Sequence, residues 1–217
     1  MKRTLLAVSA IIVLASCGSN TDKAATAEKQ EAAAATGASF TVDTASTVGF
    51  RATHKGGVEP HDGLIKVQGG TIAVDGDKVT GGSITIAMAT LKDLDITDTT
   101  KKGQLEGHLK SPDFFDVAKY PTAKFEITKV APYDSTQAKS LLPGATHLLS
   151  GNLTLKDSTV NLTFPAKITI TGKAITAEAK FTVDRTTWGL NYKGPNNAQD
   201  WLISKDVDLT LNLNAKM

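Results

Sequence analysis

The apolar residues of this chain recur at every second position over long stretches, and this pattern constrains the fold more than any other feature. In segment 207–215 one parity is apolar throughout, while the other carries Asp, Thr and Asn. Segments 160–170 and 175–183 repeat the pattern. Because successive side chains of a strand point to opposite faces, these segments predict strands with one buried and one hydrated face.

About eight such segments follow Ser39, most of them separated by short turns. The sequences Asp-Gly-Asp at 75–77 and Thr-Gly-Lys at 171–173 are typical of turns between neighbouring antiparallel strands. This spacing indicates an antiparallel sandwich or an up-and-down barrel. A transmembrane barrel would alternate in the same way, but aromatic residues are too few for two girdles, and several strands carry charges on either face.

The alternation is interrupted over residues 98–127. Leu105, His108 and Leu109 fall there at the helical spacing of three and four residues. A helix inserted between strands predicts a plug that covers one end of the sheet structure and closes off its interior. His108 lies on the apolar stripe of this plug, where a structural hydrogen-bonding role and a ligand contact are both open.

The segment after the helical stretch contains two adjacent aromatic residues. Ser-Pro-Asp at 111–113 favours a new helical start, so Phe114 and Phe115 should lie on one short helical turn that ends before Tyr120. Adjacent helical positions cannot both face inward. We therefore expect one ring to line the interior and the other to pack the plug onto the barrel rim.

The inward-facing set mixes long aliphatic side chains with the small residues Gly151, Ala166, Ala177 and Ala179. The interior of an eight-stranded barrel is just wide enough to be filled by its own side chains or to hold one slender ligand. Small residues leave space that either neighbours or a guest could fill. From the strands alone, a packed core and a ligand tunnel both remain open.

The N-terminal residues are typical of an export signal and are not expected to belong to the folded domain. Lys2 and Arg3 precede a short apolar run, and Leu-Ala-Ser-Cys at 14–17 resembles a bacterial lipobox containing the only cysteine of the sequence. We predict a lipoprotein signal peptide at 1–16 and lipidation of Cys17; the alternative is an ordinary cleaved signal in which this cysteine is incidental. Several acyl chains on one cysteine would anchor the protein stably in a membrane.

Residues 17–37 contain no aromatic and no bulky aliphatic side chain, which predicts a flexible tether before a folded domain at 38–217. The chain has 24 basic and 22 acidic residues, and cleavage would remove two of the basic ones. The mature domain would then be neutral, which argues against nucleic acid as a partner. It would also contain no disulfide.

No metal site is predicted. His54, Glu59, His61 and His147 match no compact ligand spacing, and 54–61 reads as a Gly/Pro loop with solvated histidines. The group Asp93, Asp95 and Asp98 is explained by turns and caps.

Catalysis is a minority hypothesis. The sequence contains no G-x-S-x-G motif, and the mature domain would have no cysteine nucleophile. We expect Arg185 to form a structural ion pair with the adjacent Asp184.

An ordered set of short motifs resembles the YceI-like family, the bacterial polyisoprenoid-binding, lipocalin-like domain. The set spans nearly all of 39–217 and consists of Val42-Asp43, Val48-Gly49-Phe50, the run His108 to Asp116 (HLKSPDFFD), Tyr120-Pro121 with Phe125, Asp184-Arg185, and Trp188-Gly189-Leu190. The resemblance implies an all-β fold, an antiparallel eight-stranded lipocalin-like barrel with a short helical plug between strands. Because the sequence offers no reactive constellation, we predict a non-enzymatic protein without a cofactor.

The same resemblance implies an apolar tunnel that binds, stores or carries a polyisoprenoid such as a quinone or its precursor. Together with the lipobox-like motif at 14–17, it predicts a lipid-anchored periplasmic domain of the bacterial envelope. The residues expected to contact the ligand are Phe50, Ile86, Met88, His108, Leu109, Phe114, Phe115, Tyr120, Phe125, Phe164, Ala179, Phe181 and Trp188. The alternatives are an envelope interaction module with a packed interior and, less favoured, a lipid-modifying enzyme. Exposed sheet edges or the ligand mouth could support a homodimer.

Overall fold

The computed structural model describes residues 23–54, 58–136, 139–194 and 203–217. Its strands are β1 (Ala25–Ala27), β2 (Ala38–Val42), β3 (Thr47–His54), β4 (Glu59–Asp75), β5 (Lys78–Ala87), β6 (Lys92–Asp93), β7 (Thr122–Pro132), β8 (His147–Leu155), β9 (Ser158–Thr171), β10 (Ala174–Asp184) and β11 (Ile203–Lys216). Its helical segments are η2 (Met88–Thr90), α1 (Thr99–Lys110) and η3 (Arg185–Trp188).

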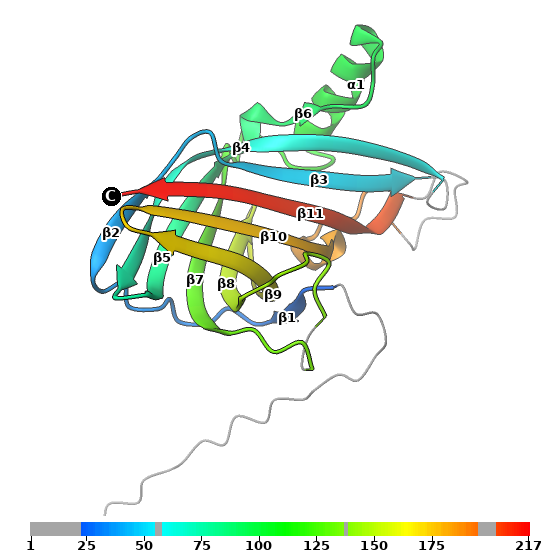
Figure 1. Ribbon diagram of the computed structural model, residues 1–217. Coiled ribbons are helices and arrows are strands. Elements are labelled where there is room, and N and C mark those ends of the chain that lie inside the picture. The colour runs from blue at the N-terminus through cyan, green and yellow to red at the C-terminus, as the bar shows by residue number, and fades with distance from the viewer. Residues whose placement is uncertain (1–22, 55–57, 137–138, 195–202) are drawn as a thin grey trace, which may run out of the picture.

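The strands close into a barrel (Figure 1). Antiparallel pairing runs from β9 through β10 to β11, which pairs with β2 and β3. It continues from these two strands through β4, β5 and β7 to β8, and β8 pairs back to β9. Strands β2 and β3 share one position, because each pairs with both β11 and β4. The result is a closed eight-stranded antiparallel barrel with one α-helix, which confirms the predicted fold class.

Helix α1 stands at one end of the barrel, which we call the open end, and projects beyond the strands (Figure 1). The helix begins at Thr99 because the Asp98 carboxylate caps it, accepting hydrogen bonds from the N–H groups of Thr100 and Lys101 at 2.9 Å each. The helix therefore begins six residues before Leu105, the first residue of the predicted apolar stripe. Within the described ranges, no helix is long and apolar enough to cross a membrane.

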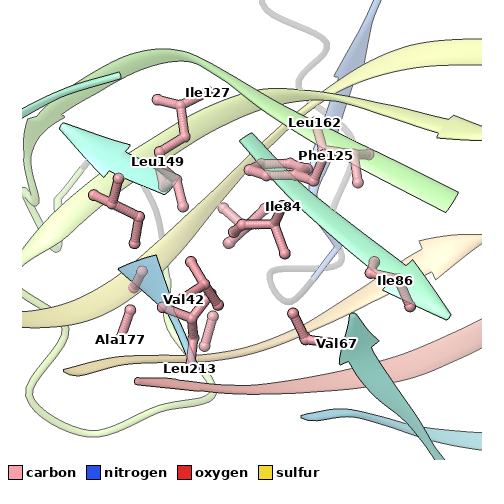
Figure 2. Packing of buried hydrophobic residues seen from close by; sticks show 14 of the residues in the cluster. Val42, Val67, Ile84, Ile86, Phe125, Ile127, Leu149, Leu162, Ala177 and Leu213 are labelled. Carbon is pink, nitrogen blue, oxygen red and sulfur yellow. The ribbon is translucent and has the colours of Figure 1, made fainter. Parts of the chain in front are cut away.

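The opposite end, which we call the closed end, is packed. Figure 2 shows aliphatic side chains from several strands meeting there, including Val42, Ile84, Ile127, Leu149 and Leu213. A void of only about 30 Å³ remains among them. That volume is close to the room one water molecule occupies.

Three phenylalanines separate the two ends, and we call them the floor. The rings of Phe164 and Phe181 stack with centroids 3.9 Å apart, and Phe125 tilts against Phe164 at 6.0 Å. The floor rings fill the space beside the small inward-facing residue Gly151. A Cβ atom added at Gly151 would lie 2.1 Å from Cζ of Phe125, so the ring occupies the space that the glycine leaves. Aromatic neighbours, rather than a guest, fill this part of the barrel.

The segment 23–36 lies against the outer face of the barrel, and we call it the strap. Strand β1 pairs with β9 at 161–163, beyond the point where β10 stops pairing with β9. The side chain of Asn152 accepts a hydrogen bond from the Gln30 N–H at 3.0 Å and donates one to its carbonyl at 2.7 Å. The N–H of Ala33 donates to the carbonyl of Ile127 at 2.9 Å.

The predicted flexible tether is thus corrected over residues 23–36. Bulky side chains are not needed here, because an unpaired strand edge and the buried amide of Asn152 supply partners for the backbone. The predicted signal peptide and Cys17 lie outside the described residues.

Candidate ligand-binding cavity

The open end encloses a cavity of about 340 Å³. Strands β3, β4, β5, β7, β8, β10 and β11 supply its wall, and α1, the turns after it, η3 and the following segment supply its roof. The wall is almost entirely apolar, with side chains such as Val48, Ile65, Leu153, Val207 and Leu209. Along β7, Ala123 lines the cavity while Ile127 lines the small void, which places Phe125 between the two spaces.

His108 holds the roof together. Its ring meets Tyr192 edge-on at 4.8 Å and Phe114 edge-on at 5.1 Å, and the latter two rings lie 5.2 Å apart. Its Nε2 atom lies 3.0 Å from Oδ2 of Asp113. His108 therefore links the end of α1 to the segment after η3, a structural task in addition to lining the cavity.

Phe114 and Phe115 both line the cavity, so the expectation that only one ring faces inward is wrong. The physical reason is that residues 111–117 form a series of turns rather than a helix. The N–H of Phe115 reaches back to the carbonyl of Leu109 at 3.1 Å, and Asp116 adopts a φ of 47°. This irregular backbone turns two adjacent rings the same way, which a helix could not do.

Arg185 fixes the rest of the roof from within. The buried guanidinium donates hydrogen bonds to the carbonyls of Leu190, Tyr192, Ile203 and Ser204. Burial lowers the pKa of Arg185 below its ordinary value. Four carbonyl acceptors stabilise the charge and tie the segment after η3 to the start of β11.

The predicted ion pair between Arg185 and Asp184 is not formed. Asp184 instead pairs with Lys205 at 3.2 Å and accepts a hydrogen bond from the N–H of Thr186 at 3.0 Å. Burial alone would raise the pKa of Asp184, but the bonds from Thr186 and Lys205 outweigh it and lower that pKa. Trp188 completes η3 and donates from Nε1 to the carbonyl of Leu153 at 3.0 Å.

His54 and His61 line the cavity at its rim. Residues 54–61 were expected to form a solvated loop, yet both histidines lie on strands, at the end of β3 and the start of β4. Their rings stack with centroids 5.2 Å apart. The expectation fails because the pairing of β3 with β4 extends to His54 and Glu59 despite Pro60 in the run.

Two aspartates adjoin this rim. Burial raises the pKa of Asp93 above its ordinary value. Burial would also raise the pKa of Asp95, but hydrogen bonds from the Asp62 N–H and from His61 outweigh it and lower that pKa. Both residues were expected to serve only as turn and cap residues. That holds for one oxygen of Asp93, whereas Asp95 bonds to the distant strand β4. Asp93 Oδ1 accepts from the Ile96 N–H at 2.8 Å, and Asp95 Oδ1 from the Asp62 N–H at 2.7 Å.

The structure brings together in the cavity wall eight of the side chains expected to contact a ligand: Phe50, Ile86, Met88, His108, Leu109, Phe114, Phe115 and Trp188. Phe125, Phe164 and Phe181 form the floor instead, and Ala179 is buried on the closed side of it. Tyr120 lies outside the cavity, where its hydroxyl donates to Asp157 Oδ2 at 3.4 Å.

Sequence reasoning missed much of the wall, including Val48, Ala52, Leu153, Leu155, Val183, Tyr192, Val207 and Leu209. Most of these share the inward parity of their strands, so alternation identified them as inward-facing without saying at which end they lie. Tyr192 follows η3, outside any strand, and gave no such signal.

The fold and the cavity together define a lipocalin-like barrel, a closed antiparallel β-barrel with an apolar interior space at one end. A family model described as the YceI-like domain matches residues 19–215. The chain therefore belongs to the YceI-like family. A search of curated proteins finds no match to this chain.

Two solved structures share the fold. BcnA of Burkholderia cenocepacia superposes with a TM-score of 0.60 at 20% identity, covering 81% of this chain and 99% of its own. A polyisoprenoid binding domain from Saccharophagus degradans, described as implicated in plant cell wall breakdown, gives a TM-score of 0.59 at 16% identity, covering 82% of this chain and 97% of its own. At such identities the similarity establishes the fold.

Proposed function

We propose that this protein binds a polyisoprenoid-type lipid, such as an isoprenoid quinone or its precursor, in the cavity at the open end of the barrel. The observation that carries the proposal is an apolar space of about 340 Å³ whose histidines lie at the rim and roof. The description of the S. degradans structure as a polyisoprenoid binding domain supports the same ligand class.

The energetics of the cavity suit such a ligand. Each methylene group moved from water into an apolar site contributes about 0.8 kcal/mol, so a prenyl chain can bind with few polar contacts. The floor limits how deep the chain can enter. We therefore expect the cavity to take a short prenyl chain or the leading end of a longer one, with any polar head group near the rim.

The proposed setting is the bacterial cell envelope, with Cys17 as the lipid attachment site and the barrel in the periplasm. The sequence motif at 14–17 supports this part of the proposal. Replacing Cys17 with Ser should abolish metabolic labelling by a radioactive fatty acid and release the protein from membranes. Labelling that persists in Cys17→Ser would contradict the proposed attachment site.

Native mass spectrometry tests the ligand proposal directly. Residues 18–217, which retain the whole strap, would be produced in bacteria, purified without detergent, measured intact and then extracted with organic solvent. We expect a co-purifying lipid whose mass series is spaced by prenyl units and which is recovered chemically unchanged. Protein that remains ligand-free when offered prenyl quinones would favour the alternative of an interaction module.

A pair of variants assigns the ligand to the cavity. Ala123→Phe places a ring into the cavity, so it should fold and lose the lipid. Thr176→Phe adds the same ring on the exposed face of β10, and this variant should retain the lipid. Equal lipid content in both variants would mean that the lipid binds elsewhere.

A further inference from the structure

We propose that His61, Asp93 and Asp95 form a binding site for a divalent first-row transition metal ion at the rim of the cavity. One imidazole nitrogen and two carboxylate oxygens lie within 4.8 Å of one another there. His61 Nδ1 is 3.1 Å from Asp95 Oδ2 and 4.0 Å from Asp93 Oδ2. The proposal is independent of the identity of the lipid.

The backbone brings these donors together. Strand β6 pairs with β4 so that Asp93 stands opposite Gly63, and the N–H of Leu94 donates to the carbonyl of Asp62 at 2.8 Å. Oδ1 of each aspartate is occupied by the main-chain N–H already described, which leaves Oδ2 of each to point toward His61. Ligating carboxylates in metal sites are commonly oriented by such outer hydrogen bonds.

The second, independent observation is an unsatisfied atom. The Asp93 side chain is only 1% exposed, and its Oδ2 atom has no hydrogen-bond partner among the residues that the structure describes. A buried carboxylate oxygen without a partner is strongly unfavourable. A cation between Oδ2 of Asp93, Oδ2 of Asp95 and Nδ1 of His61 would satisfy this atom and would offset the repulsion between the two carboxylates.

His61 is oriented by its other nitrogen. Its Nε2 atom lies 3.2 Å from Nε2 of His54, and this contact holds Nδ1 toward the carboxylates. Tetrahedral coordination with bonds of about 2.0–2.1 Å places donors about 3.3 Å apart, and the separations of 3.1 and 4.0 Å bracket that value. An imidazole with carboxylates suits zinc and its neighbours better than calcium or magnesium.

Zinc chloride is the probe for the first experiment. The full chain, without an affinity tag, would be purified in detergent, stripped with a chelator and titrated by calorimetry, with metal content measured after gel filtration. We expect one zinc ion per chain and no comparable binding of calcium. His61→Gln and Asp95→Asn should each weaken zinc binding more than about 10-fold, since even outer-shell substitutions have effects of that size.

His147→Gln is the matched control. It removes a histidine at the closed end, on β8, and should leave zinc binding unchanged. Absence of stoichiometric zinc binding would overturn the proposal. Zinc binding that His61→Gln and Asp95→Asn leave intact would overturn it equally.

Asp93→Asn separates metal binding from a purely structural role. Asparagine keeps an oxygen to accept from the Ile96 N–H but removes the buried negative charge. The metal-free variant should therefore be at least as stable as the parent, while the rise in Tm that zinc produces should disappear. A zinc-dependent rise in Tm equal to that of the parent would show that Asp93 is not a ligand and would overturn the three-residue site.

Discussion

The two ends of the barrel use the same strands and the same alternation, yet one holds a cavity of about 340 Å³ and the other a void of about 30 Å³. The closed end has aliphatic side chains meeting across a narrow space beneath the floor. At the open end, aromatic rings such as Phe114 and Trp188 stand in the roof. The comparison teaches that alternation determines which side chains face inward, whereas the positions of the rings determine where the space remains.

Removing the floor should erase the difference between the two ends and have the largest effect. Phe164→Ala deletes the central ring of the floor, which is 2% exposed, and should lower the free energy of unfolding by about 3–5 kcal/mol. Urea unfolding measures this loss. If the variant folds, the two spaces should merge, and native mass spectrometry should detect longer prenyl chains.

Phe50→Ala is the control for this floor variant. Phe50 is half-buried and lines the cavity, so one side of its ring already lacks packing partners. The loss of stability should be clearly smaller than for Phe164→Ala. Equal losses would mean that the open end is packed as tightly as the floor.

The same substitution at the two ends should have opposite consequences. Ala179, 1% exposed and paired with Leu211 at the closed end, has no room for a ring, and Ala179→Phe should cost about 1–3 kcal/mol in stability. Ala123→Phe should cost less and instead displace the ligand. Thermal unfolding and lipid content, measured on both variants, test the contrast; an Ala179→Phe variant of unchanged stability would contradict it.

The strap crosses the outer face between the two ends and should contribute less to the free energy of unfolding than the floor does. Asn152→Ala removes both hydrogen bonds to Gln30 and the buried bond that Asn152 accepts from Asn161. We expect a loss of about 1–2 kcal/mol, because the strap can rebind water and the Asn161 amide keeps its bond to Thr128. Hydrogen exchange should increase over residues 23–36 and remain unchanged in the floor. Unaltered exchange in the strap would show that Asn152 does not hold it.

The smallest effect should come from pH at the closed end. Burial lowers the pKa of His147 below its ordinary value of 6.5, so the unfolded chain takes up a proton more readily than the folded one. The contribution of His147 to stability is thus complete above pH 6.5 and declines as the pH falls through that value. His147→Gln should show a shallower fall in Tm between pH 7.5 and 5 than the parent; identical slopes would contradict the assignment.

Much of the fold was predictable because it depends on local pattern. The inward parity of segments 160–170 and 175–183 and the helical spacing of Leu105, His108 and Leu109 were sufficient for the strands and the helical insertion. The choice of a barrel over a sandwich came from the family resemblance. The positions of residues along the barrel axis were not predictable. Whether Ala179 or Ala123 borders empty space depends on register across several strands, and no single segment contains that information.

The rim of the cavity shows a second reason why parts of the structure could not be predicted from the sequence. His61 and Asp95 are distant in the sequence, and only the pairing of β4 with β6 brings them together. The turn role expected for Asp93 is real but uses only one oxygen, and Asp95 bonds instead to the backbone of β4. The direction of the second oxygen of each aspartate is a tertiary property. The strap was mispredicted because its partners are backbone groups and one amide side chain, which leave no hydrophobic pattern.

The strap begins beside the cavity. The N–H of Ala24 donates to the carbonyl of Thr182 at 2.9 Å, and Lys23 Nζ lies 2.6 Å from Oδ1 of Asp206, next to the cavity residues Val183 and Val207. If Cys17 carries the predicted anchor, the chain from it to Lys23 reaches at most about 22 Å, at roughly 3.3–3.6 Å per residue. The open end would then stay close to the bilayer surface, and the proposed prenyl ligand would pass between membrane and protein over a short path instead of diffusing through bulk water.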